Sequence, residues 1–242
     1  MMRLDKYLCE TGFGTRSQVK TFLKKGLVTV NGESIKKPEY KVDETKDLIT
    51  CMGKQASYAA FTYLMMNKPP GVVCATEDAR DRTVLDLLPA EKRKGLFPAG
   101  RLDKDTEGLL LLTDDGALAH RLLSPARHVD KTYYARILGE VTKAHQEKFL
   151  EGLEIGEKKP TLPAVLAILK SGSESEVHVT IQEGKFHQIK RMFRAVGCEV
   201  IYLRRLSMGA LTLDERLRPG EYRELTKNEL EAIKENRTDG GR

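Results

Sequence analysis

Hydrophobic and polar positions follow two different periods along this chain, and these periods predict where helices and strands lie. Residues 188–196 give the clearest helix, because apolar side chains recur at i, i+3, i+4 and i+7 from Ile189. Residues 175–181 alternate between apolar and polar, which is typical of a strand with one buried face. The chain therefore contains both kinds of element.

Shorter apolar runs predict the remaining elements. Capping boxes at Thr15–Gln18 and Thr226–Glu229 indicate two further helix starts. Helices are expected at residues 3–10, 15–25, 83–88, 117–123, 143–150 and 226–233. Strands are expected at residues 27–30, 63–66, 72–75, 97–99, 109–113 and 131–138, with a turn at 67–71. Short helices and strands that interleave with hairpin-length loops favour an α+β fold with a mixed, mostly antiparallel sheet flanked by helices and loops.

The composition changes after about fifty residues and predicts two domains. Residues 1–53 are expected to form a small α/β module, and residues 61–235 a larger domain. Residues 54–60 (KQASYAA) are polar, small and unpatterned, so we expect a linker there. The tail 236–242 is expected to be loose.

Charge and cysteine content narrow the classes of function. Lys and Arg number 41 against 35 acids, and the formal net charge of +6 favours a polyanionic partner, nucleic acid first. The four cysteines form no C-x-x-C pair, which argues against zinc or a redox dithiol, and no metal site is expected. No apolar run reaches membrane-spanning length and the N-terminus lacks the apolar core of a signal peptide, so we expect a cytoplasmic protein without a membrane partner.

The second helix carries a basic stripe, because Arg16, Lys20 and Lys24 are four residues apart. Such a stripe is often simply a solvated face. However, R-L-D-K-Y-L at 3–8 and T-R-S-Q-V-K-T-F-L-K-K-G-L-V-T-V-N-G at 15–32 resemble the RNA-binding domain of the ribosomal S-four type. The resemblance implies that Arg3, Arg16, Lys20 and Lys24 contact RNA phosphates, which gives affinity and register rather than sequence reading.

A charged loop stands directly before four consecutive leucines, in G-R-L-D-K-D-T-E-G-L-L-L-L-T-D-D-G at 100–116. Asp103 lies between two expected strands, where a carboxylate needs a partner. From the residues alone, three interpretations stay open: an ordinary acidic turn, one catalytic acid, or a glycosidase pair formed by Asp103 and Asp105.

This loop resembles the G-R-L-D-x-x-T-x-G-L-L-L-L-T-x-D-G motif of pseudouridine synthases, in their ribosomal-RNA branch related to the small-subunit enzyme. N-K-P-P-G at 67–71, K-T-Y at 131–133 and E-G-K-F-H-Q-I-K-R-M-F at 183–193 extend the resemblance to nearly the whole chain. It implies an isomerase that detaches uracil from ribose, turns it and rejoins it through carbon five. No cofactor is expected, because nothing is oxidised or reduced.

The resemblance also implies roles for individual side chains. Asp103 would be the essential carboxylate, Tyr133 would lie against the uracil, and Lys190 would pair with Asp103; without the resemblance, Tyr133 reads as a core aromatic. Helical phase supports the choice of lysine, since Lys190 flanks the apolar stripe whereas Arg191 points away from the core. Further RNA contacts are expected at Arg101, Thr106, Lys68, Lys131, His187, Gln188, Arg191 and Arg194.

The stretch E-G-K-F-H-Q-I-K-R-M-F at 183–193, which we call the third motif, resembles the small-subunit branch of the family more than the large-subunit branch. It therefore implies a uridine-516-type site of 16S RNA as target. As partner we expect ribosomal RNA in a partly assembled small ribosomal subunit, and we expect the enzyme to be a monomer. A 23S RNA target and a non-catalytic RNA-binding assembly factor are the alternatives.

Overall fold

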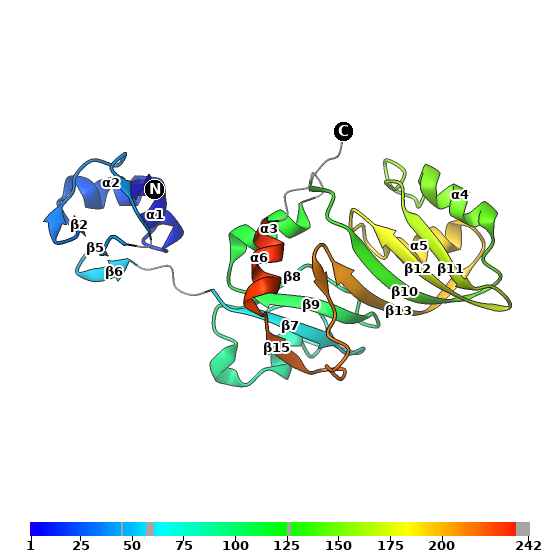
Figure 1. Cartoon of the computed structure of the whole chain (residues 1–242). Helices are drawn as coiled ribbons and strands as arrows, with labels where there is room; N and C mark the ends of the chain where they lie inside the picture. Colours follow the sequence, from blue (N-terminus) through cyan, green and yellow to red (C-terminus); the bar gives the residue numbers. More distant parts are fainter. Residues whose placement is uncertain (45, 57–60, 125–126, 236–242) are drawn as a thin grey trace. The chain divides into compact units, whose positions relative to one another are not determined.

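The computed structural model of the 242-residue chain describes residues 1–44, 46–56, 61–124 and 127–235. The chain forms two compact units that divide between Phe61 and Thr62 (Figure 1). We call them the N-terminal and the C-terminal unit. Among the described residues, no helix combines the length and apolarity needed to cross a bilayer.

The N-terminal unit packs two helices with small sheets. The Thr15 hydroxyl accepts a hydrogen bond from the Gln18 amide at the start of the second helix, so the predicted capping box is present. Asn31 and Gly32 both have positive φ in the turn that joins β2 to β3, as the Asn-Gly pair predicted. The elements are β1 (Met2–Arg3), α1 (Leu4–Glu10), α2 (Arg16–Lys24), β2 (Val28–Val30), β3 (Glu33–Ser34), β4 (Lys41–Val42), β5 (Ile49–Cys51) and β6 (Lys54–Ala56).

The C-terminal unit is built on a nine-stranded mixed sheet with main order β11-β12-β10-β13-β9-β7-β15. The pairing of β13 with β9 is parallel and the other strand pairs in it are antiparallel, as the α+β prediction required. The strands are β7 (Tyr63–Lys68), β8 (Phe97–Ala99), β9 (Glu107–Thr113), β10 (Lys131–Leu138), β11 (Val165–Lys170), β12 (Glu174–Ile181), β13 (Glu199–Met208), β14 (Leu211–Thr212) and β15 (Tyr222–Glu224).

Helices lie beside both halves of this sheet. Figure 1 shows α3 and α6 near β7 and β9, and α4 and α5 near β10 to β12. Ile189, Met192 and Phe193 of α5 are buried in the main core cluster together with Tyr133, which confirms the apolar stripe. The helices are η1 (Val84–Leu87), η2 (Ala90–Lys92), α3 (Gly116–Leu123), α4 (Lys143–Glu151), α5 (Gln188–Ala195) and α6 (Lys227–Glu235).

Three local expectations need correction. The first part of the expected linker, Lys54–Ala56, is strand β6, because it pairs with β5 and buries Ala56; residues 57–60 and the tail 236–242 lie outside the described residues. Residues 72–75 form no strand beyond an isolated bridge between Val73 and Thr83. β7 continues two residues past its expected end at Met66, because Asn67 and Lys68 are buried and hydrogen-bonded.

Candidate active site

A loop of residues 100–106 joins β8 to β9 and carries Asp103. The Thr106 amide donates to the Asp103 carbonyl at 3.1 Å, which closes a turn around the acidic residue. The buried Leu102 side chain anchors the loop, and the Leu102 amide donates to Cys74 Sγ at 3.3 Å. The Asp103 carboxylate is therefore presented from a fixed turn, a quarter exposed.

Lys68 stands beneath this loop rather than on the surface. Its side chain is fully buried, and Nζ donates to the carbonyls of Pro69 (3.0 Å), Lys104 (3.3 Å) and Thr106 (2.7 Å). Burial lowers the pKa of Lys68. The expectation that Lys68 contacts RNA is wrong, because a buried ammonium shared among three carbonyls supports the loop from inside.

Gly108 explains why the loop can join the sheet at this point. It has a φ of +101°, and a Cβ placed there would lie 2.3 Å from the Arg205 carbonyl oxygen. Glycine thus permits the parallel contact of β9 with β13 directly after the loop. Behind it, the buried Arg205 donates through Nε to the Leu109 carbonyl at 2.7 Å.

Two carboxylates share one lysine at the mouth of the site. Lys190 Nζ lies 3.2 Å from Asp103 Oδ2 and 2.6 Å from Asp105 Oδ1. His187 Nε2 lies 3.6 Å from Asp103 Oδ1, within ion-pair reach when the ring is protonated. Burial alone would lower the pKa of Lys190, but the hydrogen bond to Asp105 and the charge of Asp103 outweigh it and raise the pKa. Lys190 is therefore a fixed cation at neutral pH.

Asp103, Tyr133 and Thr106 line one pocket of about 70 Å³. Tyr133 reaches it from β10 and is 7% exposed, packed against the main core cluster. Thr106 is 2% exposed, and within the described ranges its hydroxyl Oγ1 has no hydrogen-bond partner. Buried hydroxyls are normally paired, so this hydroxyl is available to a molecule that enters the pocket.

Two predicted RNA contacts of the third motif are used inside the protein instead. Gln188 is 4% exposed; its Oε1 accepts from the Lys185 amide at 2.9 Å and its Nε2 donates to Glu183 at 3.2 Å. The Arg191 guanidinium donates to Glu157 Oε1 at 2.7 Å and to the carbonyls of Phe186 and Ile155. Both side chains hold the turn before α5, so the expectation that they bind RNA is not supported by this geometry.

The other predicted contacts differ in exposure. Arg101 is exposed and lines the pocket, and Arg194 is exposed on α5. Lys131 is 8% exposed and donates to the Val129 carbonyl at 2.8 Å, so it is placed to support the backbone rather than to bind RNA. Burial and the nearby Arg205 lower the pKa of Lys131 to about 8.

Phe186 was missed by the sequence analysis. Its side chain is 74% exposed and stacks on the His187 ring, with centroids 3.8 Å apart and planes 18° apart. An exposed aromatic stacked on His187, whose Nε2 lies 3.6 Å from Asp103 Oδ1, is a ready stacking platform for a nucleobase. The sequence did contain a signal that Phe186 is exposed, because this aromatic residue belongs to no apolar period and stands between Lys185 and His187.

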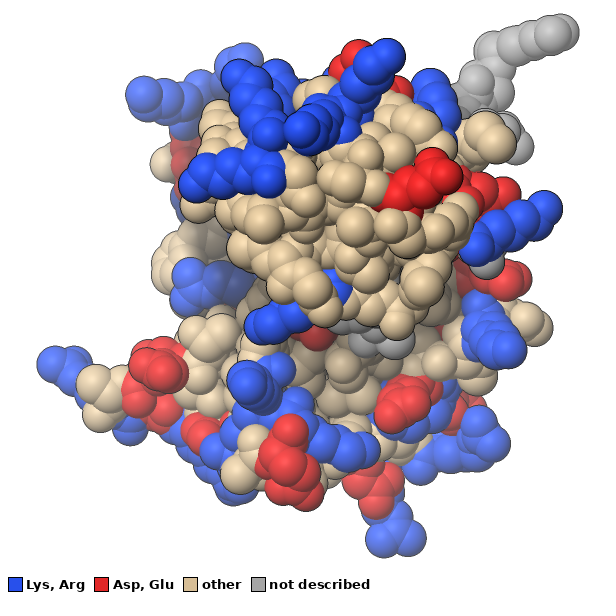
Figure 2. Space-filling model, turned by 90° about the vertical axis from the view of Figure 1, so that its left-hand side faces the viewer, with Lys and Arg blue, Asp and Glu red and all other residues tan. Residues whose placement is uncertain are grey.

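The basic stripe of the N-terminal unit is present as predicted in sequence. Arg16, Lys20 and Lys24 are exposed along α2, whereas Arg3 is held by a bidentate contact with Asp5 at 3.0 and 2.8 Å. Figure 2 shows a face of the molecule on which Lys and Arg side chains gather along the upper edge. Such a surface suits a polyanion.

Comparison with known proteins gives consistent matches. A family model described as RNA pseudouridylate synthase matches residues 62–195, and an S4 domain model matches residues 2–49. The chain is 50% identical to an uncharacterised RNA pseudouridine synthase of Bacillus subtilis, over 97% of this chain and 99% of that protein. It is 45% identical to ribosomal small subunit pseudouridine synthase A of Vibrio cholerae, over 96% and 99%. A crystal structure of a pseudouridylate synthase matches with a TM-score of 0.70 at 39% identity, over 96% of this chain and 100% of that one.

Proposed function

The chain belongs to the RNA pseudouridylate synthase family, and from that premise we propose that it converts one uridine of small-subunit ribosomal RNA to pseudouridine, with Asp103 as the catalytic carboxylate. The observation that carries the proposal is the 3.2 Å contact between Lys190 Nζ and Asp103 Oδ2 at the pocket that Tyr133 also lines. A family that isomerises RNA has no use for a glycosidase pair, so the two-acid interpretation is dropped.

The reaction requires an ionised carboxylate next to the anomeric carbon of the target nucleotide. The bond from N1 of uracil to C1′ breaks, a bond from C5 to C1′ forms, and the proton on C5 leaves while N1 gains one. Breaking the first bond leaves C1′ short of electrons. Asp103 can stabilise or trap this carbon, or take a proton from the sugar, and each role requires the ionised carboxylate, which lies 3.2 Å from Lys190 Nζ.

Tyr133 and Thr106 are proposed to receive the base. The Tyr133 ring presents a flat face to uracil, and its phenol can assist removal of the C5 proton. The spare Thr106 hydroxyl is proposed to hydrogen bond the nucleotide, because binding would give this buried oxygen the partner it lacks within the described chain. A base inside folded RNA must first swing out of its stack to reach them.

The N-terminal unit is proposed to hold the RNA through phosphates. Arg16, Lys20 and Lys24 offer positive charge without reading sequence. For the target we propose the uridine-516-type site of 16S RNA, in a partly assembled small subunit, because several relatives carry the name ribosomal small subunit pseudouridine synthase A. A cytoplasmic location follows from that substrate.

The test compares two variants of neighbouring acids. Asp103→Asn should abolish pseudouridine formation on a 16S RNA fragment while RNA affinity stays within about threefold, because the amide keeps the shape but loses the charge. The matched control is Asp105→Asn, which touches the same lysine from a side chain that is 71% exposed and should keep most of the rate. Normal turnover by Asp103→Asn would refute the assignment, and equal losses in both variants would revive a paired-acid mechanism.

A further inference from the structure

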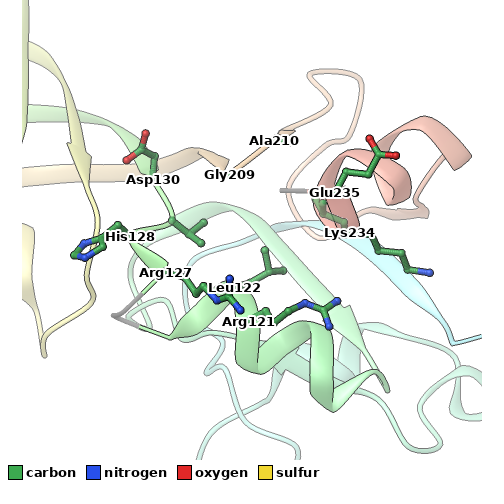
Figure 3. A pocket seen from close by; sticks show the side chains of 11 residues that line it. Arg121, Leu122, Arg127, His128, Asp130, Gly209, Ala210, Lys234 and Glu235 are labelled. Carbon is green, nitrogen blue, oxygen red and sulfur yellow. The ribbon is translucent and has the colours of Figure 1, made fainter. Parts of the chain in front are cut away.

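A large hollow in the C-terminal unit lies outside the Asp103 pocket. It has a volume of about 930 Å³ and is bounded by α3, the segment 127–130, the turn at Gly209–Ala210 and the end of α6 (Figure 3). Neither Asp103 nor Tyr133 lines it. The proposed chemistry therefore leaves this feature unexplained.

Basic side chains outnumber acidic ones in the lining of this hollow. Arg121, Arg127 and Lys234 line it together with His128 and two acids, Asp130 and Glu235, and the Lys234 ammonium lies 5.3 Å from the centroid of the Tyr63 ring. Asp130 Oδ1 already accepts a hydrogen bond from Gln182 Nε2 at 2.9 Å. Within the part of the chain that the structure describes, the side chains of Arg121, Arg127 and His128 have no hydrogen bond or ion pair. Uncompensated arginines are well suited to phosphate, which their planar donors bind in pairs.

The backbone under these side chains is fixed. The Gly209 amide donates to the Asp130 carbonyl at 2.8 Å, and Lys131 Nζ donates to the Val129 carbonyl at 2.8 Å. Val129 is buried, and His128 is held at a φ of +48°. The side chains at 127–130 therefore extend from a backbone that is already held by hydrogen bonds. Ligand binding would cost little conformational entropy in ordering that backbone.

The same segment leads straight into the proposed active site. Arg127 precedes Tyr133 by six residues, or ~20 Å of fully extended chain at most. One RNA molecule can therefore reach the Asp103 pocket and the hollow together. The hollow is also too large for a single free phosphate ion, which favours a run of backbone.

We propose that this hollow, which we call the cationic hollow, binds the sugar–phosphate backbone of the substrate RNA beside the target uridine. That the bound polyanion is RNA rests on the proposed function. It adds a second RNA contact in the C-terminal unit, through Arg121 and Arg127, that is separate from the residues assigned to the chemistry. It predicts that this surface contributes affinity and positioning rather than chemical rate.

The experiment uses the full chain with two charge reversals, Arg121→Glu and Arg127→Glu. The matched control reverses two exposed lysines of α4, Lys143→Glu and Lys148→Glu, so that both proteins lose four units of net charge. Affinity for a labelled 16S RNA fragment is measured by fluorescence anisotropy over a series of salt concentrations. The single-turnover rate is then measured at saturating RNA.

The arginine variant should bind RNA at least about tenfold more weakly than the lysine control. The slope of its log binding constant against log salt concentration should be smaller in magnitude by up to about 2. Its rate at saturation should stay within about threefold of the unmodified chain. Equal affinities of the two variants would overturn the cationic hollow. If the glutamate variant does not fold, the variant Arg121→Gln with Arg127→Gln is measured instead. It should also have a shallower salt slope than the unmodified chain, and an unchanged slope would refute the cationic hollow as an RNA-binding site.

Failure of the two proposals can be told apart. If the unmodified chain binds the RNA but forms no pseudouridine, the proposed function fails while the binding comparison still decides the hollow. If pseudouridine forms and the arginine variant binds like the control, the hollow alone is refuted.

Discussion

Lys68 gives the sharpest test of how the fold positions the loop that carries Asp103. Replacing it with methionine keeps the length of the side chain but removes the ammonium that joins the Pro69, Lys104 and Thr106 carbonyls. The Lys104 carbonyl retains the Gly71 amide at 2.7 Å, so two carbonyls lose their donor in the described structure. The loop should shift rather than unfold.

The effect of Lys68→Met on the free energy of unfolding is the difference between two opposing contributions. Two unpaired buried carbonyls cost about 1–3 kcal/mol each, and removal of a buried charge returns several kcal/mol. These terms largely cancel, so we expect Lys68→Met to change the free energy of unfolding by no more than about 3 kcal/mol. A displacement of Asp103 by roughly 1 Å should lower kcat about 100-fold. Affinity for RNA should change little, because Lys68 is fully buried.

Single-turnover kinetics, RNA binding and chemical unfolding measure the three quantities. The control is Asp81→Asn, which breaks a tether on the outside of the same loop, the 2.5 Å contact with Lys104 Nζ. That pair is half-exposed and worth about 0–1 kcal/mol, so its loss should leave kcat near normal. A near-normal kcat for Lys68→Met, or an equal loss for Asp81→Asn, would refute the view that the buried tether positions Asp103.

Two further predictions concern other basic side chains. Lys131 has a pKa of about 8 in the folded protein and of 10.5 in the unfolded chain, so the unfolded chain binds more protons between these pH values. The free energy of unfolding should therefore rise with pH in this range, by at most about 3 kcal/mol. Lys131→Met should lack this rise when unfolding is measured from pH 7 to 10.5, and an identical rise in the variant would refute the burial argument. Reversing Lys20 and Lys24 to glutamate should weaken RNA binding and flatten its salt dependence; unchanged anisotropy curves would remove α2 from the interface.

Apolar runs and helical stripes predicted several elements, whereas a strand that buries charged side chains was missed. The four leucines from Leu109 to Leu112 gave β9, and the stripe of α5 gave its helix. β13 was missed although it pairs with three strands, because Arg204 and Arg205 interrupt its apolar alternation. Arg205 is 2% exposed, and its burial depends on the Leu109 carbonyl that only the folded sheet supplies.

The same limit applies to the site. The family resemblance implied a pair of Lys190 with Asp103, helical phase supported the choice of this lysine, and the structure has that contact. A motif shows that Lys68 and Gln188 are polar, but not that the fold buries them against loop carbonyls or a neighbouring carboxylate. Phe186 carries no apolar period, so its exposure beside His187 emerges only from the turn before α5.

The central claim is that this chain, through Asp103, modifies one uridine of small-subunit ribosomal RNA. The most direct measurement maps pseudouridines at nucleotide resolution in ribosomal RNA from cells that lack the protein. We predict that one small-subunit site is lost, that the unmodified protein restores it, and that the Asp103→Asn protein does not. An unchanged map, a missing site in 23S RNA alone, or full restoration by Asp103→Asn would contradict the account.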